Sequence, residues 1–323
     1  MLSLDRISKI YRVGAFGSKQ LVAVRDVSFD VGPGEVVSLI GESGSGKTTI
    51  GRMVLRLNAV SRGRILFQGV DVSRLRGGAL KGYYRQVQGV FQDPFSSFNP
   101  IFKADRVFQM VKEEYFRGVG REKWHDKLDA ALLDVRLDPA AVLNKYPHQL
   151  SGGQLQRLLI ARALLLDIEV LVADEVISML DASTRIDVLN LLADLKARGL
   201  GILFVTHDLA LGNYLSTRTV ILRKGVVVEM GATGQVFDDP RHPYTKTLLG
   251  SVPQLHKKWS EVAAELHLAD RAKVEHCDYH DQFPGECGPP AGDPDQPTLA
   301  AVAPDHFVAC ARAGDIQAEL LAA

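Results

Sequence analysis

A glycine-rich segment near the amino terminus has the composition of a phosphate-binding loop. Residues 41–48 read Gly-Glu-Ser-Gly-Ser-Gly-Lys-Thr, between a predicted strand at 35–40 and a predicted helix at 49–57. Glycines let backbone N–H groups close around phosphate oxygens at a helix amino terminus; Lys47 supplies charge to the β- and γ-phosphates, and the Thr48 hydroxyl suits Mg²⁺. The predicted nucleotide contacts are Gly41, Ser43, Gly44, Ser45, Gly46, Lys47, Thr48 and Thr49.

Two adjacent carboxylates end an apolar run in the second half of the chain. Residues 168–173 are nearly all apolar, as in a parallel strand buried on both faces, and Asp174 and Glu175 follow directly. An α/β sheet presents catalytic groups at this edge. Asp174 therefore suits Mg²⁺, and Glu175 suits the orientation and deprotonation of a water that attacks a γ-phosphate. A solvated acidic loop is the alternative, and the phosphate loop upstream makes it the less favoured one.

A serine and two glycines form a second candidate anion site. Residues 151–153 precede a predicted helix at 155–166, so backbone N–H groups lie at its amino terminus. One chain has no need of two sites for one γ-phosphate, whereas a head-to-tail pair would let each second site close over the partner's nucleotide. Residues 150–157, Leu-Ser-Gly-Gly-Gln-Leu-Gln-Arg, resemble the signature motif of ABC transporter ATPases. The resemblance implies nucleotide contacts from Ser151, Gly153 and Gln154.

The resemblance covers about residues 1–255 and implies roles for three further residues. Gln92 matches the glutamine that contacts Mg²⁺ and relays the nucleotide state to transmembrane subunits. Tyr11 is similar to the aromatic residue that stacks on adenine, and His207 to the histidine that holds the γ-phosphate and the water. The implied catalytic set is Lys47, Gln92, Glu175 and His207, and the implied Mg²⁺ set is Thr48, Gln92 and Asp174. Taken without the family, an isolated tyrosine or histidine is more often structural.

The segment after Glu175 departs from the family pattern. It reads Val-Ile-Ser-Met-Leu-Asp, where the family usually has Pro-Thr-Ser-Ala-Leu-Asp. Because Ser178, Leu180 and Asp181 are kept, we expect this dimer-contacting loop to be functional, with Asp181 at the nucleotide.

Two stretches, residues 91–100 and 239–249, resemble the oligopeptide/dipeptide importer branch of the family. This resemblance implies an ATP- and Mg²⁺-dependent ATPase subunit at the cytoplasmic face of the membrane. Its partners would be a second ATPase chain, identical or paralogous, two transmembrane permease subunits and an extracytoplasmic solute-binding protein. Members of the branch mostly import short peptides, and some import oligosaccharides or other solutes, which the other subunits select.

The predicted fold is α/β: a P-loop, RecA-like ABC ATPase core with an antiparallel β subdomain and a helical subdomain at about 95–158. The nucleotide-binding domain would span 1–255, followed by a partly irregular C-terminal extension at 256–323. Residues 261–323 contain 12 acidic and 3 basic residues and 6 of the 14 prolines. Cys277, Cys287 and Cys310 resemble the remnant of an iron–sulfur segment, but four thiolates are the usual requirement. The sequence therefore favours three thiols without a cluster.

Composition excludes several other functions. Lys+Arg and Asp+Glu both number 38, so the formal net charge is zero, and nucleic acid is not an expected partner. Apolar runs are too short to span a bilayer, and no basic segment leads into an apolar run at the amino terminus, so we expect no secretory signal. Two alternatives remain: a soluble ABC ATPase that acts on DNA or ribosomes, and a nucleotide-binding regulator with little turnover.

Overall fold

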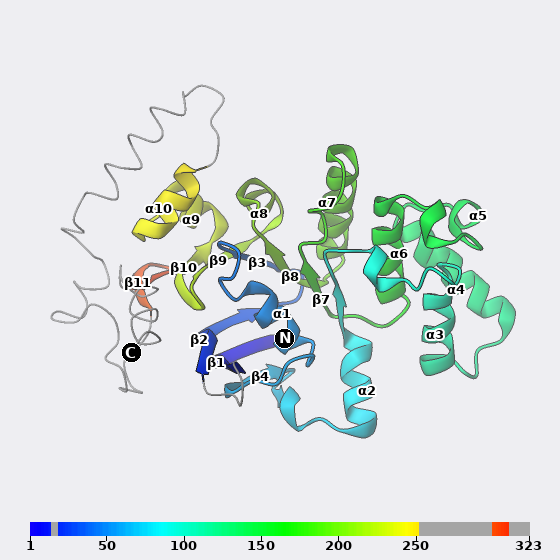
Figure 1. Ribbon diagram of the computed structural model, residues 1–323, viewed down its shortest axis with the longest axis horizontal. Helices are drawn as coiled ribbons and strands as arrows, with labels where there is room; N and C mark the ends of the chain where they lie inside the picture. The colour runs from blue at the N-terminus through cyan, green and yellow to red at the C-terminus, as the bar shows by residue number, and fades with distance from the viewer. Residues whose placement is uncertain (14–18, 252–298, 310–323) are drawn as a thin grey trace. The chain divides into compact units, whose positions relative to one another are not determined.

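The computed structural model describes residues 1–13, 19–251 and 299–309. The chain forms two compact units: Met1–Leu75 with Leu203–Ala323, and Arg76–Ile202 (Figure 1). The phosphate loop belongs to the first unit, and the paired carboxylates belong to the second.

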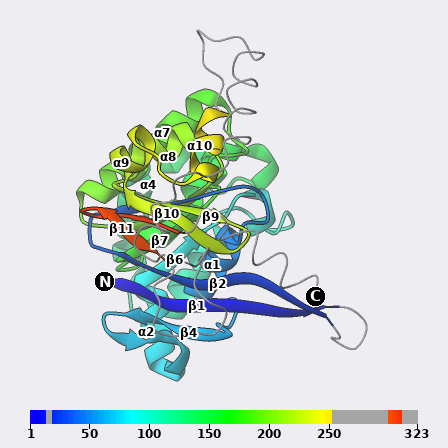
Figure 2. The same cartoon turned by 90° about the vertical axis from the view of Figure 1, so that its left-hand side faces the viewer.

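A four-stranded antiparallel sheet forms one part of the first unit (Figure 2). Its strand order is β2-β1-β4-β5, and β1 pairs with β2 and β4, so that Leu2 lies opposite both Val31 and Phe67. Gln68 and Gly69 both have positive φ (51° and 79°), as the tight turn between β4 and β5 requires. The predicted antiparallel β part is confirmed. Its strands are β1 (Leu2–Val13), β2 (Lys19–Val31), β4 (Arg62–Phe67) and β5 (Val70–Asp71), followed by a 3₁₀ turn at Val72–Arg74.

The larger sheet of the first unit has the order β11-β12-β10-β9-β3-β8. β3 and β8 are buried along their whole length, and β3 pairs in parallel with β9, as expected at the centre of an α/β sheet. β9, β10, β12 and β11 pair antiparallel in turn. The strands are β3 (Val36–Ile40), β8 (Gly201–Thr206, of which 203–206 belong to this unit), β9 (Arg218–Arg223), β10 (Val226–Ala232), β11 (Ala300–Ala303) and β12 (His306–Val308).

Four helices complete the described part of the first unit: α1 (Lys47–Val54), α8 (Leu209–Leu215), α9 (Thr233–Asp238) and α10 (Pro243–Gly250). A buried apolar cluster joins α8, α9 and α10 to the larger sheet. It consists of Ile40, Leu209, Ile221, Val228, Val236 and Tyr244.

The second unit is mostly helical, with one parallel pair of strands (Figure 1). Helix α6 contacts α3, α4 and α7 as well as β6, so it is the central helix of this unit. The predicted α/β fold with a helical part is confirmed. The elements are α2 (Gly77–Gln86), β6 (Val87–Val90), α3 (Arg106–Tyr115), α4 (Arg121–Asp134), α5 (Pro139–Val142), α6 (Gly152–Leu164), β7 (Val170–Asp174) and α7 (Ala182–Ala197), with 3₁₀ turns at Phe95–Ser97 and Pro147–Gln149.

The predicted extension at 256–323 falls mostly outside the described residues, as do Cys277, Cys287 and Cys310. Within 299–309 the chain forms β11 and β12, which extend the larger sheet at β10. The boundary at 255 and the limits of the helical subdomain stay predictions. None of the helices that the structure describes is long and apolar enough to cross a bilayer.

Candidate functional site

The phosphate loop leaves the buried strand β3 and ends where α1 begins at Lys47. Gly41, Gly44 and Gly46 all have positive φ. A Cβ atom at Gly41 would lie 2.1 Å from the Leu222 carbonyl oxygen, and one at Gly46 would lie 2.6 Å from the Ala23 carbonyl oxygen. Backbone crowding as well as conformation therefore demands glycine at both positions.

Lys47 is held at the centre of this loop, with only 5% of its surface exposed. Its Nζ donates hydrogen bonds to the carbonyl oxygens of Gly41 (2.7 Å) and Glu42 (2.8 Å). Because Lys47 is also the first residue of α1, its ammonium group lies near the positive end of a helix dipole. Thr48 and Thr49 follow in the first turn of the helix. This arrangement can bind the oxygens of a phosphate chain.

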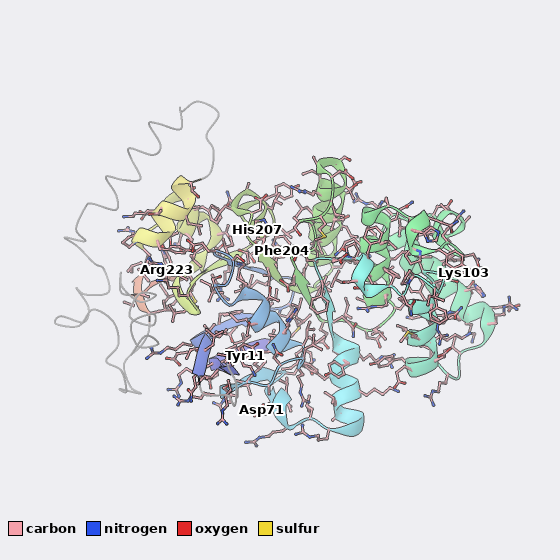
Figure 3. The ribbon with its side chains drawn as sticks, in the orientation of Figure 1. Tyr11, Asp71, Lys103, Phe204, His207 and Arg223 are labelled. Atoms are coloured by element: carbon pink, nitrogen blue, oxygen red, sulfur yellow. The ribbon has the colours of Figure 1, made fainter. Side chains whose placement is uncertain are left out.

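Tyr11 lies on β1, in the small sheet (Figure 3). Its hydroxyl oxygen accepts a hydrogen bond from Asn58 Nδ2 (2.9 Å), and Lys9 Nζ lies 5.0 Å from the centre of its ring. Lys9 Nζ also donates to the Ala59 carbonyl oxygen (2.7 Å). The segment that follows α1 thus orients the ring in two ways: Asn58 bonds its hydroxyl directly, and Ala59 holds Lys9, which lies over the ring. No pattern in the sequence indicates either Asn58 or Ala59.

His207 follows the carboxyl end of β8 and has an exposed side chain (Figure 3). Asp208 then caps α8, with its carboxylate accepting from the Leu211 N–H (3.2 Å). The cap begins a new helix directly after His207, so the histidine lies at a sharp change of chain direction at the strand end where α/β sheets carry functional groups.

In the second unit, β7 is buried throughout and ends at Asp174, whose surface is 5% exposed. Glu175 follows with φ = 49°, a left-handed conformation that is rare for glutamate. Its carbonyl oxygen accepts from both the backbone N–H (3.1 Å) and the hydroxyl (2.9 Å) of Ser178. This turn holds Glu175 in its unusual conformation, and such conformations are concentrated at functional sites.

Helix α6 starts with a reciprocal pair of hydrogen bonds. Ser151 Oγ accepts from the Gln154 N–H (3.2 Å), and Gln154 Oε1 accepts from the Ser151 N–H (2.9 Å). The two predicted nucleotide contacts thus also form a capping box. The Ser151 hydroxyl keeps its own hydrogen to donate to an anion.

Asp181 caps α7 with both carboxylate oxygens. They accept from Ser183 Oγ (2.6 Å), the Thr184 N–H (3.0 Å) and Thr184 Oγ1 (2.9 Å). The hydroxyl of Ser183, followed by the N–H and hydroxyl of Thr184, lowers the pKa of Asp181 from 3.8 to about 2. The side chain thus stabilises its own loop, and a contact with nucleotide would have to compete with these bonds.

Gln92 is exposed, two residues after β6 ends. Side chains of α6 hold the backbone just before it: Gln156 Nε2 donates to the Phe91 carbonyl oxygen (3.3 Å), and Arg162 Nη2 donates to that of Gly89 (3.1 Å). The helix that begins at the second anion site therefore also anchors the segment that leads to Gln92. This link could not be predicted from the sequence: Gln156 lies within the motif at 150–157, but no local pattern connects it or Arg162 with the backbone of residues 89–91.

The predicted site residues are thus divided between the units. The first unit carries Tyr11, Gly41, residues 43–49 and His207, and the second carries Gln92, Ser151, Gly153, Gln154, Asp174, Glu175 and Asp181. The predicted Mg²⁺ ligands are a hydroxyl, an amide and a buried carboxylate, and their oxygens are the donors that Mg²⁺ prefers. Within the described residues, no three His, Cys, Asp or Glu side chains gather into a metal site by themselves. The donor set fits an ion that is held partly by substrate phosphates.

Two family models match the chain. The first, described as "ABC transporter", matches residues 24–178. The second, described as "Oligopeptide/dipeptide transporter, C-terminal region", matches residues 228–282. The match to the second model includes residues 228–232 of β10, and all of α9 and α10.

Curated relatives match over almost the whole chain. A putative peptide import ATP-binding protein of Brucella ovis is 37% identical over 97% of this chain and 98% of its own length. The oligopeptide transport ATP-binding protein OppF of Streptococcus pyogenes is 38% identical over 90% of both chains. Among solved structures, a dimeric ATP-binding cassette in a post-hydrolysis state with ADP and phosphate matches with a TM-score of 0.64, at 28% identity, over 72% of this chain and 99% of that one.

Proposed function

Because the chain belongs to the ABC transporter family, we propose that it is the subunit that binds and hydrolyses ATP to drive the import of oligopeptides or dipeptides. The observation that carries the proposal is the phosphate loop, which closes two carbonyl groups around a buried Lys47 at the start of α1. The relatives named for peptide import support the solute class. Oligosaccharides are the alternative solute.

ATP would bind with its phosphates against the N–H groups of residues 43–48 and the ammonium of Lys47, and with adenine on the ring of Tyr11. A second ATPase chain, arranged head to tail, would add the first turn of its α6, where Ser151 can donate its hydroxyl hydrogen. Positive charge and N–H groups from both chains would then stabilise the negative charge that develops on the γ-phosphate during transfer.

Glu175 would orient the attacking water and accept its proton, and His207 would hold the γ-phosphate and the same water. The turn closed by Ser178 gives Glu175 a defined position before nucleotide arrives. Thr48, Gln92 and Asp174 would hold Mg²⁺, which when bound neutralises charge on the β- and γ-phosphate oxygens.

The assembly would consist of two ATPase chains, identical or paralogous, on the cytoplasmic face of two transmembrane permease subunits. An extracytoplasmic solute-binding protein would deliver the solute. Closure of the ATPase pair on ATP, and its reopening after hydrolysis, would switch the permease between its inward-facing and outward-facing states.

The proton-accepting role is tested with Glu175→Gln. We expect the variant to bind ATP, to lose about two to four orders of magnitude in turnover, and to accumulate as a closed dimer. Glu122→Gln, an exposed change on α4, is the matched control and should keep full turnover. ATPase rates, ATP titration and gel filtration measure these effects, and undiminished turnover in Glu175→Gln would refute the assignment.

The transport role is tested by affinity purification from gently solubilised membranes. We expect two multi-pass membrane proteins to co-purify with the tagged chain, with or without a second ATPase. Recovery with ribosomes or DNA-processing proteins only would overturn transport while leaving the ATPase chemistry intact.

A further inference from the structure

Residues from the far end of the chain join the unit that carries the phosphate loop. β12 pairs with β10, with Gly231 opposite His306 and Glu229 opposite Val308, and α10 contacts the same strand (Figure 2). Four polar side chains gather there and are almost completely removed from solvent. They are Glu229 and His242 (0% exposed), His306 (2%) and Tyr244 (8%).

The carboxylate of Glu229 connects β12 to the start of α10. Glu229 Oε1 lies 2.7 Å from His306 Nε2 and also accepts from the Arg241 N–H (2.9 Å), while Oε2 accepts from the His242 N–H (3.0 Å). Burial raises the pKa of Glu229, but hydrogen bonding, that of His306 foremost, outweighs it and lowers the pKa overall. The carboxylate is therefore ionised at neutral pH, and His306 donates to it.

His242 connects the Glu229 carboxylate to α10. It is the N-cap of the helix, and its Nδ1 accepts from the Tyr244 N–H (3.0 Å). The ring of Tyr244 then packs in the apolar cluster with Ile40, at the end of β3. The guanidinium of Arg223, labelled in Figure 3, lies 5.2 Å from the ring centre, within reach of a cation–π contact. Contacts at both the backbone and the ring thus hold Tyr244 in place.

The hydroxyl of Tyr244 reaches the phosphate loop itself. It accepts from the Glu42 N–H (3.2 Å). That N–H and the Gly41 carbonyl belong to one peptide group, and the carbonyl accepts from Lys47 Nζ (2.7 Å). Tyr244 therefore holds the N–H of the peptide group between Gly41 and Glu42, and the carbonyl of the same group orients Lys47. Because a peptide group is planar, a rotation that breaks the first bond also displaces the second.

We propose that Tyr244 is a positioning residue of the nucleotide site, and that β12 holds it in place through His306, Glu229 and His242. The C-terminal part of the chain would thereby set the affinity of the phosphate loop for ATP. This inference rests on the proposed function, in that the loop is taken to bind ATP.

The first test is Tyr244→Phe in the full-length chain. The change removes only the hydroxyl and keeps the ring in the apolar cluster, so the protein should fold. We expect ATP affinity to fall by roughly 3- to 10-fold, as for the loss of one hydrogen bond, and KM for ATP to rise with kcat nearly unchanged. Tyr214→Phe, on α8 with 62% of its surface exposed, is the matched control and should bind ATP like the wild type.

The second test is a double-mutant cycle with His306→Ala. We expect this change to weaken ATP binding in the wild-type background and to have little further effect in the Tyr244→Phe background, because the effect passes through Tyr244. His306→Gln, whose amide can still donate to Glu229, should restore part of the affinity. Urea unfolding of each variant, followed in parallel, separates a loss of ATP affinity from a loss of fold.

Unchanged ATP affinity in Tyr244→Phe would overturn the inference, and additive effects in the cycle would overturn the role of β12. Lys47→Ala distinguishes these outcomes from a failure of the proposed function. It should abolish ATP binding, whereas wild-type affinity in Lys47→Ala would show that the loop is not the nucleotide site.

Discussion

At the second anion site, the side chain of Thr184 on α7 fills the space beside Gly153, where any other residue would place its Cβ atom. A Cβ atom added at Gly153 would lie 2.1 Å from Thr184 Cγ2. Threonine is branched at Cβ and has few rotamers, and its hydroxyl is bonded to Asp181, so it cannot easily turn away. Gly153 is therefore required by the packing of α6 against α7, in addition to any contact with nucleotide.

Gly153→Ala should destabilise the protein in the absence of nucleotide. Overpacking of a filled site lowers the free energy of unfolding by about 1–3 kcal/mol, and replacing glycine by alanine within a helix raises it by about 0.5–1 kcal/mol. We expect a net loss of about 1–2 kcal/mol in the free energy of unfolding. Gly152→Ala is the matched control, because its Cβ would meet Leu180 and Phe95 at 3.7 and 3.8 Å, which are ordinary contact distances.

The assay is urea unfolding followed by far-ultraviolet circular dichroism and by tryptophan fluorescence, to which Trp124, buried in α4 of the same unit, contributes. Thr184→Ser removes Cγ2 and keeps the hydroxyl, which leaves Cβ and Oγ at 3.3 and 3.4 Å from the added atom. The double variant Gly153→Ala/Thr184→Ser should therefore regain most of the stability lost relative to Thr184→Ser alone. If Gly153→Ala is as stable as Gly152→Ala, or if Thr184→Ser brings no recovery, the packing argument is wrong.

Two further predictions concern the cap of α7 and the phosphate loop. Because the pKa of Asp181 falls from 3.8 to about 2 on folding, its contribution to stability should be complete above pH 3.8 and lost as the pH falls through about 2; the difference in unfolding free energy between wild type and Asp181→Asn should shrink over that interval. Gly41→Ala should yield little folded protein, since its Cβ would collide with the Leu222 carbonyl. Gly44→Ala, with φ of 80° but no described atom within 4 Å of its Cβ, should cost only about 1–2 kcal/mol in urea unfolding.

Elements with a local pattern could be predicted from the sequence. The apolar run at 168–173 is found as β7 at Val170–Asp174, and the helix predicted at 155–166 is found as α6 at Gly152–Leu164. The phosphate loop also follows from local sequence, because strand, glycines and helix are consecutive. The capping box could have been predicted too, since Ser151 and Gln154 have its spacing, Ser-x-x-Gln.

Features that depend on distant residues could not be predicted. Nothing near Tyr244 in the sequence indicates that its hydroxyl meets Glu42, 202 residues away, and nothing near Gly153 indicates contact with Thr184. These features arise from tertiary packing, which the periodicity of single segments does not record.

The parallel pairing of β3 with β9 has a consequence for how the chain is made. Ser38 and its neighbour Thr219 are 181 residues apart, so at about 5–20 residues per second β9 is synthesised roughly 10–40 s after β3. During that interval the apolar strand Val36–Ile40 lacks the neighbour that covers one of its edges. A product truncated before residue 218 would contain the whole phosphate loop and β3 but would lack β9. We expect chaperones or proteases to bind such a product. Ribosome stalling within this interval would thus be more damaging than stalling after α10.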